Sequence, residues 1–146
     1  MTDKYGRLMV DIDGTNLSDE DKILIANKHI GGLILFKRNF DSYDQICDLV
    51  NEIHNVKKNI IIAVDQEGGS VQRFDKDFTK IPSMKAVSNH VNKKGNNGFM
   101  KDLAWLVSSE LISAGIDINF APVLDIDRNI SSIIGDRSFS DDVTEI

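Results

Sequence analysis

Four groups of polar residues each follow a short apolar run, and they hold the side chains that could do chemistry. They are residues 11–15, 37–39, 65–69 and 125–127. In α/β folds the loops after the carboxyl ends of parallel strands share one face, and ligands bind there. The sequence therefore predicts one site built from these four loops.

The segment Asp65-Gln66-Glu67-Gly68-Gly69 is the most informative of the four. Three polar groups and two glycines directly follow the apolar run 60–64, with no helix signal behind them. A carboxylate such as that of Asp65 can accept two hydroxyl hydrogen bonds at once, which suits a pair of sugar hydroxyls. The alternative interpretation makes Asp65 a local cap or a salt-bridge partner of Arg73.

The segment Asp11-Ile12-Asp13-Gly14-Thr15 suggests a different chemistry. It has the form of the nucleophile loop of haloacid dehalogenase-like phosphatases, in which one Asp attacks phosphorus, the other handles protons, and both help hold magnesium. The alternative is a turn at Asp13 and Gly14 that leads into a helix cap. The turn is favoured, because the second apolar run ends in Phe36-Lys37-Arg38 instead of the Ser or Thr that the phosphatases place there.

The loops must be positioned by strands and helices. Short, nearly continuous apolar runs predict strands that are covered on both faces, as in parallel sheets. These runs are residues 8–10, 33–36, 60–64 and 118–123.

Helices are predicted between the strands. Ser18 and three following carboxylates favour a helix to about Lys28, ending before Gly31-Gly32, and Ser42 with Gln45 forms a capping box for a second helix. A third starts at Asn97 or Gly98 and runs to Gly115, a natural C′ residue. Residues 71–97 are expected to form a long insertion.

This alternation of strands and helices predicts an α/β fold in a single domain, residues 1–146. Two architectures fit the pattern: a small open sheet of the flavodoxin type, or the first half of a TIM-type (β/α)₈ barrel with about four parallel strands and flanking helices. Length alone favours the open sheet.

Composition narrows the class of partners. The net charge is −6 and the pI is about 4.9, which disfavours a nucleic acid partner. The single Cys47 sits in a helical apolar stripe and is expected to fill the core. Residues 1–7 do not resemble an export signal, and no apolar run is long enough to span a membrane, so the cytoplasm is the default expectation.

A family resemblance resolves the choice of architecture. The stretch Ala63 to Phe74 resembles the A-V-D-Q-E-G-G-x-V-Q-R-F signature of bacterial β-N-acetylglucosaminidases of glycoside hydrolase family 3. Three more segments match this family in the same order: residues 31–39, 117–125 and 134–139. The resemblance covers essentially the whole chain, and the acidic turn at residues 11–14 falls where the family also has one.

The resemblance implies a (β/α)₈-type barrel that removes terminal β-linked N-acetylglucosamine with retention, through an intermediate on an Asp nucleophile. It implies that Asp65, Arg73 and Arg137 bind the sugar, and that peptidoglycan turnover fragments are the substrate. We expect no cofactor and no metal.

The resemblance also implies that this chain has no catalytic residue. The family's K-H-F-P-G-H-G segment, which leads into the acid/base His, does not occur in the sequence, and His29, His54 and His90 do not match it. The chain is therefore expected to be the N-terminal part of a longer enzyme and to be inactive alone, with a non-catalytic sugar-binding module as the alternative.

Half of a barrel would leave two strand edges unpaired. Such edges expose ladder groups and apolar faces, so we expect self-association or marginal stability. Residues 129–146 should form a loop.

Overall fold

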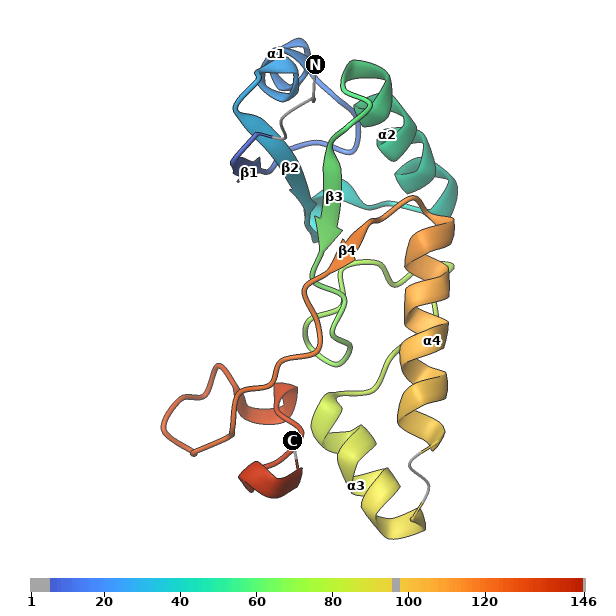
Figure 1. Cartoon of the computed structure of the whole chain (residues 1–146). Coiled ribbons are helices and arrows are strands. Elements are labelled where there is room, and N and C mark those ends of the chain that lie inside the picture. Colours follow the sequence, from blue (N-terminus) through green and yellow to red (C-terminus); the bar gives the residue numbers. More distant parts are fainter. Residues whose placement is uncertain (1–5, 96–97, 146) are drawn as a thin grey trace.

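The structure is a computed structural model that describes residues 6–95 and 98–145. Most of the segment 1–7, where an export signal was not expected, lies outside these residues, as does Asn97. Figure 1 shows one sheet with helices beside it and a C-terminal segment beneath it.

The sheet has four parallel strands in the order of the sequence: β1 (Leu8–Val10), β2 (Ile30–Leu35), β3 (Ile61–Val64) and β4 (Ile118–Asn119). The flavodoxin-type sheet places its first strand inside the sheet, and here β1 lies at an edge. The sequential order is that of the first half of a (β/α)₈ barrel, so the structure confirms the fold class that the resemblance implied.

Four α-helices and three short 3₁₀ helices connect the strands. The α-helices are α1 (Asp19–Ala26), α2 (Tyr43–Val56), α3 (Met84–Lys94) and α4 (Gly98–Ser113). The 3₁₀ helices are η1 (Lys37–Asn39), η2 (Gly135–Arg137) and η3 (Val143–Glu145). Within the described residues, no helix has both the length and the apolar character needed to cross a bilayer.

Two of the predicted helix starts have clear caps. The Ser18 hydroxyl accepts from the Asp21 backbone N–H, and the Asp21 carboxylate accepts from that of Ser18, which makes a full capping box. The Ser42 hydroxyl accepts from the Gln45 N–H, but the Gln45 side chain accepts from the Asp41 N–H, so this predicted box is only half formed. Both helices begin where the sequence placed them.

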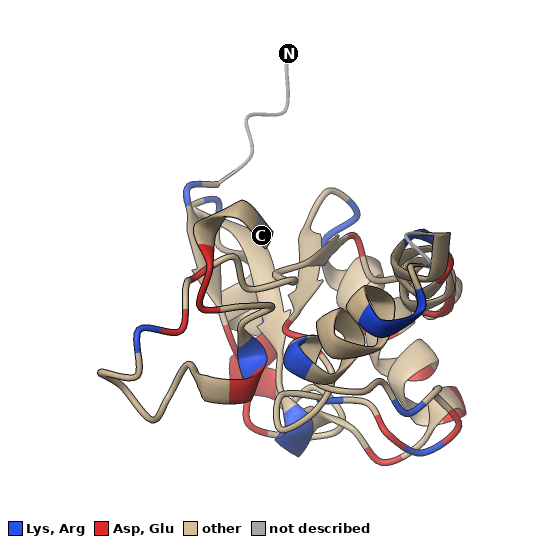
Figure 2. Ribbon diagram, turned by 90° about the horizontal axis from the view of Figure 1, so that it is seen from below, with Lys and Arg blue, Asp and Glu red and all other residues tan. Residues whose placement is uncertain are grey.

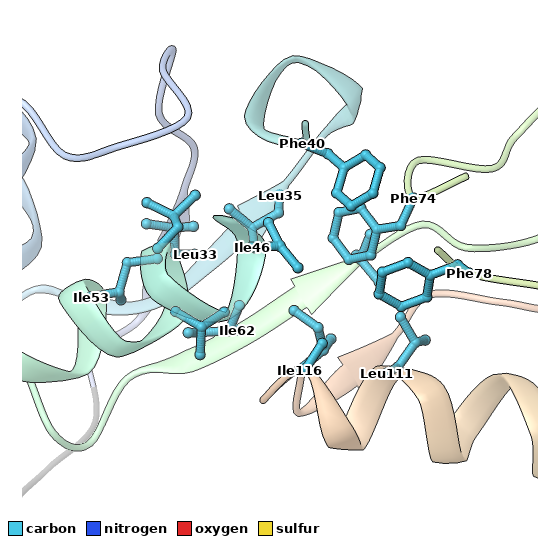
Figure 3. Packing of buried hydrophobic residues seen from close by; sticks show 14 of the residues in the cluster. Leu33, Leu35, Phe40, Ile46, Ile53, Ile62, Phe74, Phe78, Leu111 and Ile116 are labelled. Carbon is cyan, nitrogen blue, oxygen red and sulfur yellow. The ribbon is translucent and has the colours of Figure 1, made fainter. Parts of the chain in front are cut away.

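The core lies between the sheet and the helices. Leu33, Leu35, Ile62 and Val64 are fully buried on this face, and α2 packs Ile46 and Ile53 against it (Figure 3). Phe40, Phe74 and Phe78 extend this core toward α4 through ring contacts of 5.0 to 5.8 Å. The packed aromatic group fixes the chain that leaves β3, which carries the site.

Two predicted boundaries were wrong. The strand predicted at residues 118–123 is only Ile118–Asn119, because its partner β3 ends at Val64 and Pro122 has no N–H to donate. The strand predicted to begin at residue 33 begins earlier, at Ile30, so that Gly31 and Gly32 lie inside β2, whereas α1 ends before these glycines as predicted, at Ala26. Gly31 is needed in the strand because a Cβ there would lie 2.1 Å from the Gly6 carbonyl oxygen.

The predicted insertion at residues 71–97 contains a helix that the sequence analysis did not predict. The Ser83 hydroxyl caps α3 by accepting from the Ala86 N–H, and Met84, Val87 and Val91 form its buried face. Gly95 ends the helix in the left-handed conformation. In the described part of this insertion, residues 71–95, α3 therefore adds a helix that packs against α4 and η2 (Figure 1).

Both edges of the sheet are poorly covered. Leu8 and Met9 on edge strand β1 are 56% and 39% exposed, and Ile118 on edge strand β4 is 37% exposed. Exposed apolar edge strands favour pairing with other chains.

We predict that this chain self-associates at tens of micromolar, measured by sedimentation velocity. Leu8→Lys should reduce the association, because a charge on an edge strand opposes strand pairing. Ile23→Lys, the same kind of change on exposed α1, should leave it unchanged. A wild-type chain that stays monomeric and melts cooperatively at high temperature would contradict this prediction.

Asn39 ties together the loops that follow β1 and β2. Its fully buried amide donates to the carbonyl oxygens of Ile12 (2.9 Å) and Gly14 (2.8 Å), and its carbonyl oxygen accepts from the Phe36 N–H at 2.8 Å.

We predict that Asn39→Ala lowers the free energy of unfolding by about 2–4 kcal/mol, because buried backbone groups lose their partners. Urea denaturation measures this loss, with Asn51→Ala, a change at an exposed residue of α2, as the control. A loss below about 1 kcal/mol would contradict the assignment.

Candidate sugar-binding site

The loop after β3 is shaped by two glycines in left-handed backbone conformations. Gly68 and Gly69 have φ of 96° and 56°, and a Cβ on Gly68 would lie 2.5 Å from the Pro82 carbonyl oxygen. Side chains are disfavoured at such φ values. The glycine pair thus turns the chain back sharply and keeps Asp65 and Glu67 at the end of the strand.

Gln66 fixes this loop from inside. Its side chain is 2% exposed; the carbonyl oxygen accepts from the backbone N–H groups of Arg73 (2.8 Å) and Phe74 (3.0 Å), and the amide donates to the Phe74 carbonyl oxygen (2.8 Å). The backbone of Gln66 is in turn bound to both ends of the Asn119 amide. The ends of β3 and β4 and the Arg73 segment are therefore one connected unit.

Asp65 and Arg73 form an ion pair within this unit. The Arg73 Nη2 lies 3.1 Å from the Asp65 Oδ2, and the two side chains are 26% and 25% exposed. The structure contains the salt bridge that the alternative interpretation of Asp65 required. Asp65 still has acceptor capacity for sugar hydroxyls, because an ionised carboxylate offers about four lone-pair sites.

The Phe36 ring supports two arginines. The guanidinium carbon of Arg38 lies 4.8 Å from the ring centroid and that of Arg73 lies 5.5 Å away. Cation–π contacts of this kind hold a guanidinium over an aromatic face. Arg73 Nε is buried and has no hydrogen-bond partner among the described residues, so the position of Arg73 depends on Phe36 and Asp65.

Arg137 forms a second, deeper ion pair with Glu67. Its Nε donates to Oε2 at 2.8 Å and its Nη2 donates to Oε1 at 2.6 Å, across 70 positions of sequence. The Glu67 side chain is only 4% exposed, whereas that of Arg137 is 26% exposed. The bidentate pair joins the β3 loop to η2.

The three predicted binding residues come together at one end of the sheet. The hydrogen bonds that Arg137 donates to Glu67 are the main cause that raises the pKa of the Arg137 guanidinium above its usual value, and the charges of Glu67, Asp65 and Asp125 contribute. Viewed from below the strands, Figure 2 shows basic and acidic segments side by side at this end of the molecule. Asp65, Arg73 and Arg137 thus share one charged region.

The loops after β1 and β2 lie next to this region. Arg38 Nη2 pairs with the Asp11 carboxylate and Arg38 Nε donates to the Ile12 carbonyl oxygen, while Asp13 is fully exposed. Arg38 therefore pairs with both carboxylates of the turn, which the phosphatase alternative would use to hold magnesium. Among residues 6–95 and 98–145, no group of three or more His, Cys, Asp or Glu could hold a metal ion.

The segment after β4 borders the site and meets α3. Lys85 of α3 lies 3.5 Å from the buried Asp127 carboxylate, and the Ser138 hydroxyl donates to the Asp125 carbonyl oxygen at 2.6 Å. Next to Glu67 lies an apolar cavity of about 450 Å³ lined by side chains of α3, α4 and Phe139. Residues 129–146 were expected to form a loop, and their described part contains two 3₁₀ helices, η2 and η3.

Sequence reasoning missed Gln66, Glu67 and Asn119. Gln66 and Glu67 lie in the same loop segment as Asp65, but residue type and spacing assign a role only to Asp65. The burial of Glu67 and its pairing with Arg137 are visible only in the structure, whereas a Glu in a sequence is by default expected to be exposed.

Comparisons with known proteins show the family of this chain. The family model described as the N-terminal domain of glycosyl hydrolase family 3 matches residues 1–146. The beta-hexosaminidase of Idiomarina loihiensis is 48% identical over 141 residues, covering 96% of this chain and 42% of that protein, and the beta-hexosaminidase of Alkalilimnicola ehrlichii is 42% identical over 137 residues, covering 92% and 39%.

Solved structures agree as well. NagZ from Neisseria gonorrhoeae, in complex with N-trifluoroacetyl-D-glucosamine, is 37% identical with a TM-score of 0.90, over 97% of this chain and 43% of that one. A family 3 beta-N-acetylglucosaminidase from Paenibacillus sp. is 31% identical with a TM-score of 0.82, over 94% of this chain and 26% of that one. This chain spans about two fifths of the length of the curated relatives, and over that span it belongs to glycoside hydrolase family 3.

Proposed function

We propose that this chain is the amino-sugar-binding part of a retaining β-N-acetylhexosaminidase that removes terminal β-linked N-acetylglucosamine. The observation that carries the proposal is the meeting of Asp65, Arg73 and Arg137 at the carboxyl ends of the strands, where α/β barrels bind their substrates. The names of the relatives, and the amino-sugar derivative bound to the Neisseria protein, support the substrate class.

The proposed chemistry divides between binding and bond breaking. Carboxylates and guanidinium groups supply acceptors and donors for sugar hydroxyls and for the N-acyl group. Retaining hydrolysis also requires a nucleophile and an acid/base residue that flank the bond. In this proposal neither belongs to these 146 residues, because the family's K-H-F-P-G-H-G segment does not occur among them.

The biological substrate in this proposal is a peptidoglycan turnover fragment with a terminal N-acetylglucosamine, processed in the cytoplasm. It rests on the family to which the chain belongs and on the apolar patterning of the sequence, which contains no run that would span a membrane.

We predict that Asp65→Ala weakens the binding of N-acetylglucosamine to this chain by about tenfold or more, because hydrogen bonds to a charged acceptor contribute about 1.5–3 kcal/mol. Titration calorimetry or NMR titration measures the dissociation constant. Asp75→Ala is the matched control, since Asp75 lies on the same loop but pairs with Lys37. Equal affinity of Asp65→Ala and wild type would refute a sugar-binding role for Asp65.

We also predict that the purified chain releases no chromophore from a 4-nitrophenyl β-N-acetylglucosaminide. Without a nucleophile the covalent step of a retaining enzyme cannot occur. The assay uses concentrated chain and long incubation, with Asp65→Ala as the control for contaminating activity. Hydrolysis by wild type that Asp65→Ala abolishes would show that catalytic groups are present after all.

A further inference from the structure

We propose that Glu67 is a positioning residue of the sugar site: its buried carboxylate orients the Arg137 guanidinium for contact with the amino sugar. This inference rests on the proposed function, in which Arg137 is a sugar ligand. The inference adds Glu67 as a residue that does not contact the sugar and acts only through Arg137.

The geometry of the pair sets the orientation. A guanidinium has five N–H donors, and Glu67 takes one from Nε at 2.8 Å and one from Nη2 at 2.6 Å. The contact from Nη1 to the Ile133 carbonyl oxygen is long, at 3.5 Å. A two-point contact prevents rotation of the planar group, which leaves donors on Nη1 and Nη2 in a fixed direction for a ligand.

Glu67 is more deeply buried than Arg137, and this difference indicates which of the two residues orients the other. The Glu67 side chain is 4% exposed and lines the apolar cavity, whereas the Arg137 side chain is 26% exposed. A carboxylate in such a place is costly unless a cation with good geometry pairs with it. Glu67 is thus the fixed partner, and Arg137 is the partner that retains access to solvent and ligand.

Glu67 is itself rigidly held. Its backbone N–H donates to the Val71 carbonyl oxygen at 2.8 Å, and the preceding residue, Gln66, is bound to Arg73, Phe74 and Asn119. Arg137 lies on a short 3₁₀ turn, η2. The anchored loop therefore imposes its geometry on the turn, and one loop sets both Asp65 and Arg137.

The experiment compares Glu67→Gln with wild type by three measurements: the dissociation constant of N-acetylglucosamine, the melting temperature, and the NMR resonance of the Arg137 Nε–H group. The Arg137→Lys variant, which lacks this group, assigns the resonance. Glu110→Gln is the matched control. The Glu110 carboxylate also holds a loop, by accepting hydrogen bonds from Thr79, but it pairs with none of the three proposed sugar-binding residues.

We expect Glu67→Gln to raise the dissociation constant about tenfold and to move the Arg137 Nε–H resonance, since loss of the charge weakens both hydrogen bonds. Glu110→Gln should change neither. Glu67→Asp, which keeps the charge on a shorter side chain, should lose less affinity than Glu67→Gln. Adding Glu67→Gln to Arg137→Lys should weaken binding no further, because Glu67 acts only through the guanidinium.

Three outcomes would overturn the inference. Wild-type affinity in a folded Glu67→Gln chain, with Asp65→Ala impaired, would refute the role of Glu67 and leave the proposed function intact. Additive losses in the double variant would show that Glu67 acts by another route. A wild-type chain that does not bind N-acetylglucosamine at all would refute the proposed function, and the role of Glu67 with it. If Glu67→Gln does not fold, Glu67→Asp provides the same comparisons.

Discussion

The two hydrogen bonds between the Asn119 side chain and the backbone of Gln66 hold together the segments that carry the candidate site. They join the ends of β3 and β4 where the backbone ladder stops, because β3 ends at Val64. The buried Gln66 amide continues this connection to Arg73 and Phe74. A buried polar network of this kind is rigid when all its members are paired. The charged residues of the site are therefore attached to a fixed frame.

Opposite charges at the site are arranged in separate pairs, each with its own support. Arg73 pairs with Asp65 and rests on Phe36, and Arg137 pairs with Glu67 against an apolar wall. Each pairing offsets the cost of removing a charge from water and still leaves some donors or acceptors unused. A polyhydroxylated ligand needs both donors and acceptors in fixed places. In the proposed function the paired charges supply these without concentrating net charge in a chain that is acidic overall.

Local features of the fold could be predicted from the sequence, whereas long-range partners could not. The caps at Ser18 and Ser42 and three of the four strands followed from residue type and spacing. Helix α3 was missed because its Lys and Asn residues dilute the pattern of Met84, Val87 and Val91. The pairing of Glu67 with Arg137 was missed because it spans 70 positions and depends on the turn at η2. The choice of a barrel came from the family motif, since periodicity alone fits an open sheet equally well.

The distribution of apolar burial explains how a site can be ordered on a sheet that is incompletely covered. Apolar packing is concentrated on the face between β2, β3 and the helices, where Leu33, Leu35 and Ile62 are fully buried. Edge residues such as Leu8 and Ile118 contribute little to this core because they remain exposed. Hydrophobic stabilisation scales with the area removed from water, so the central strands are the most strongly stabilised part of the sheet. The site residues Asp65, Gln66 and Glu67 directly follow β3, so the candidate site is attached to a strand whose neighbours are well buried.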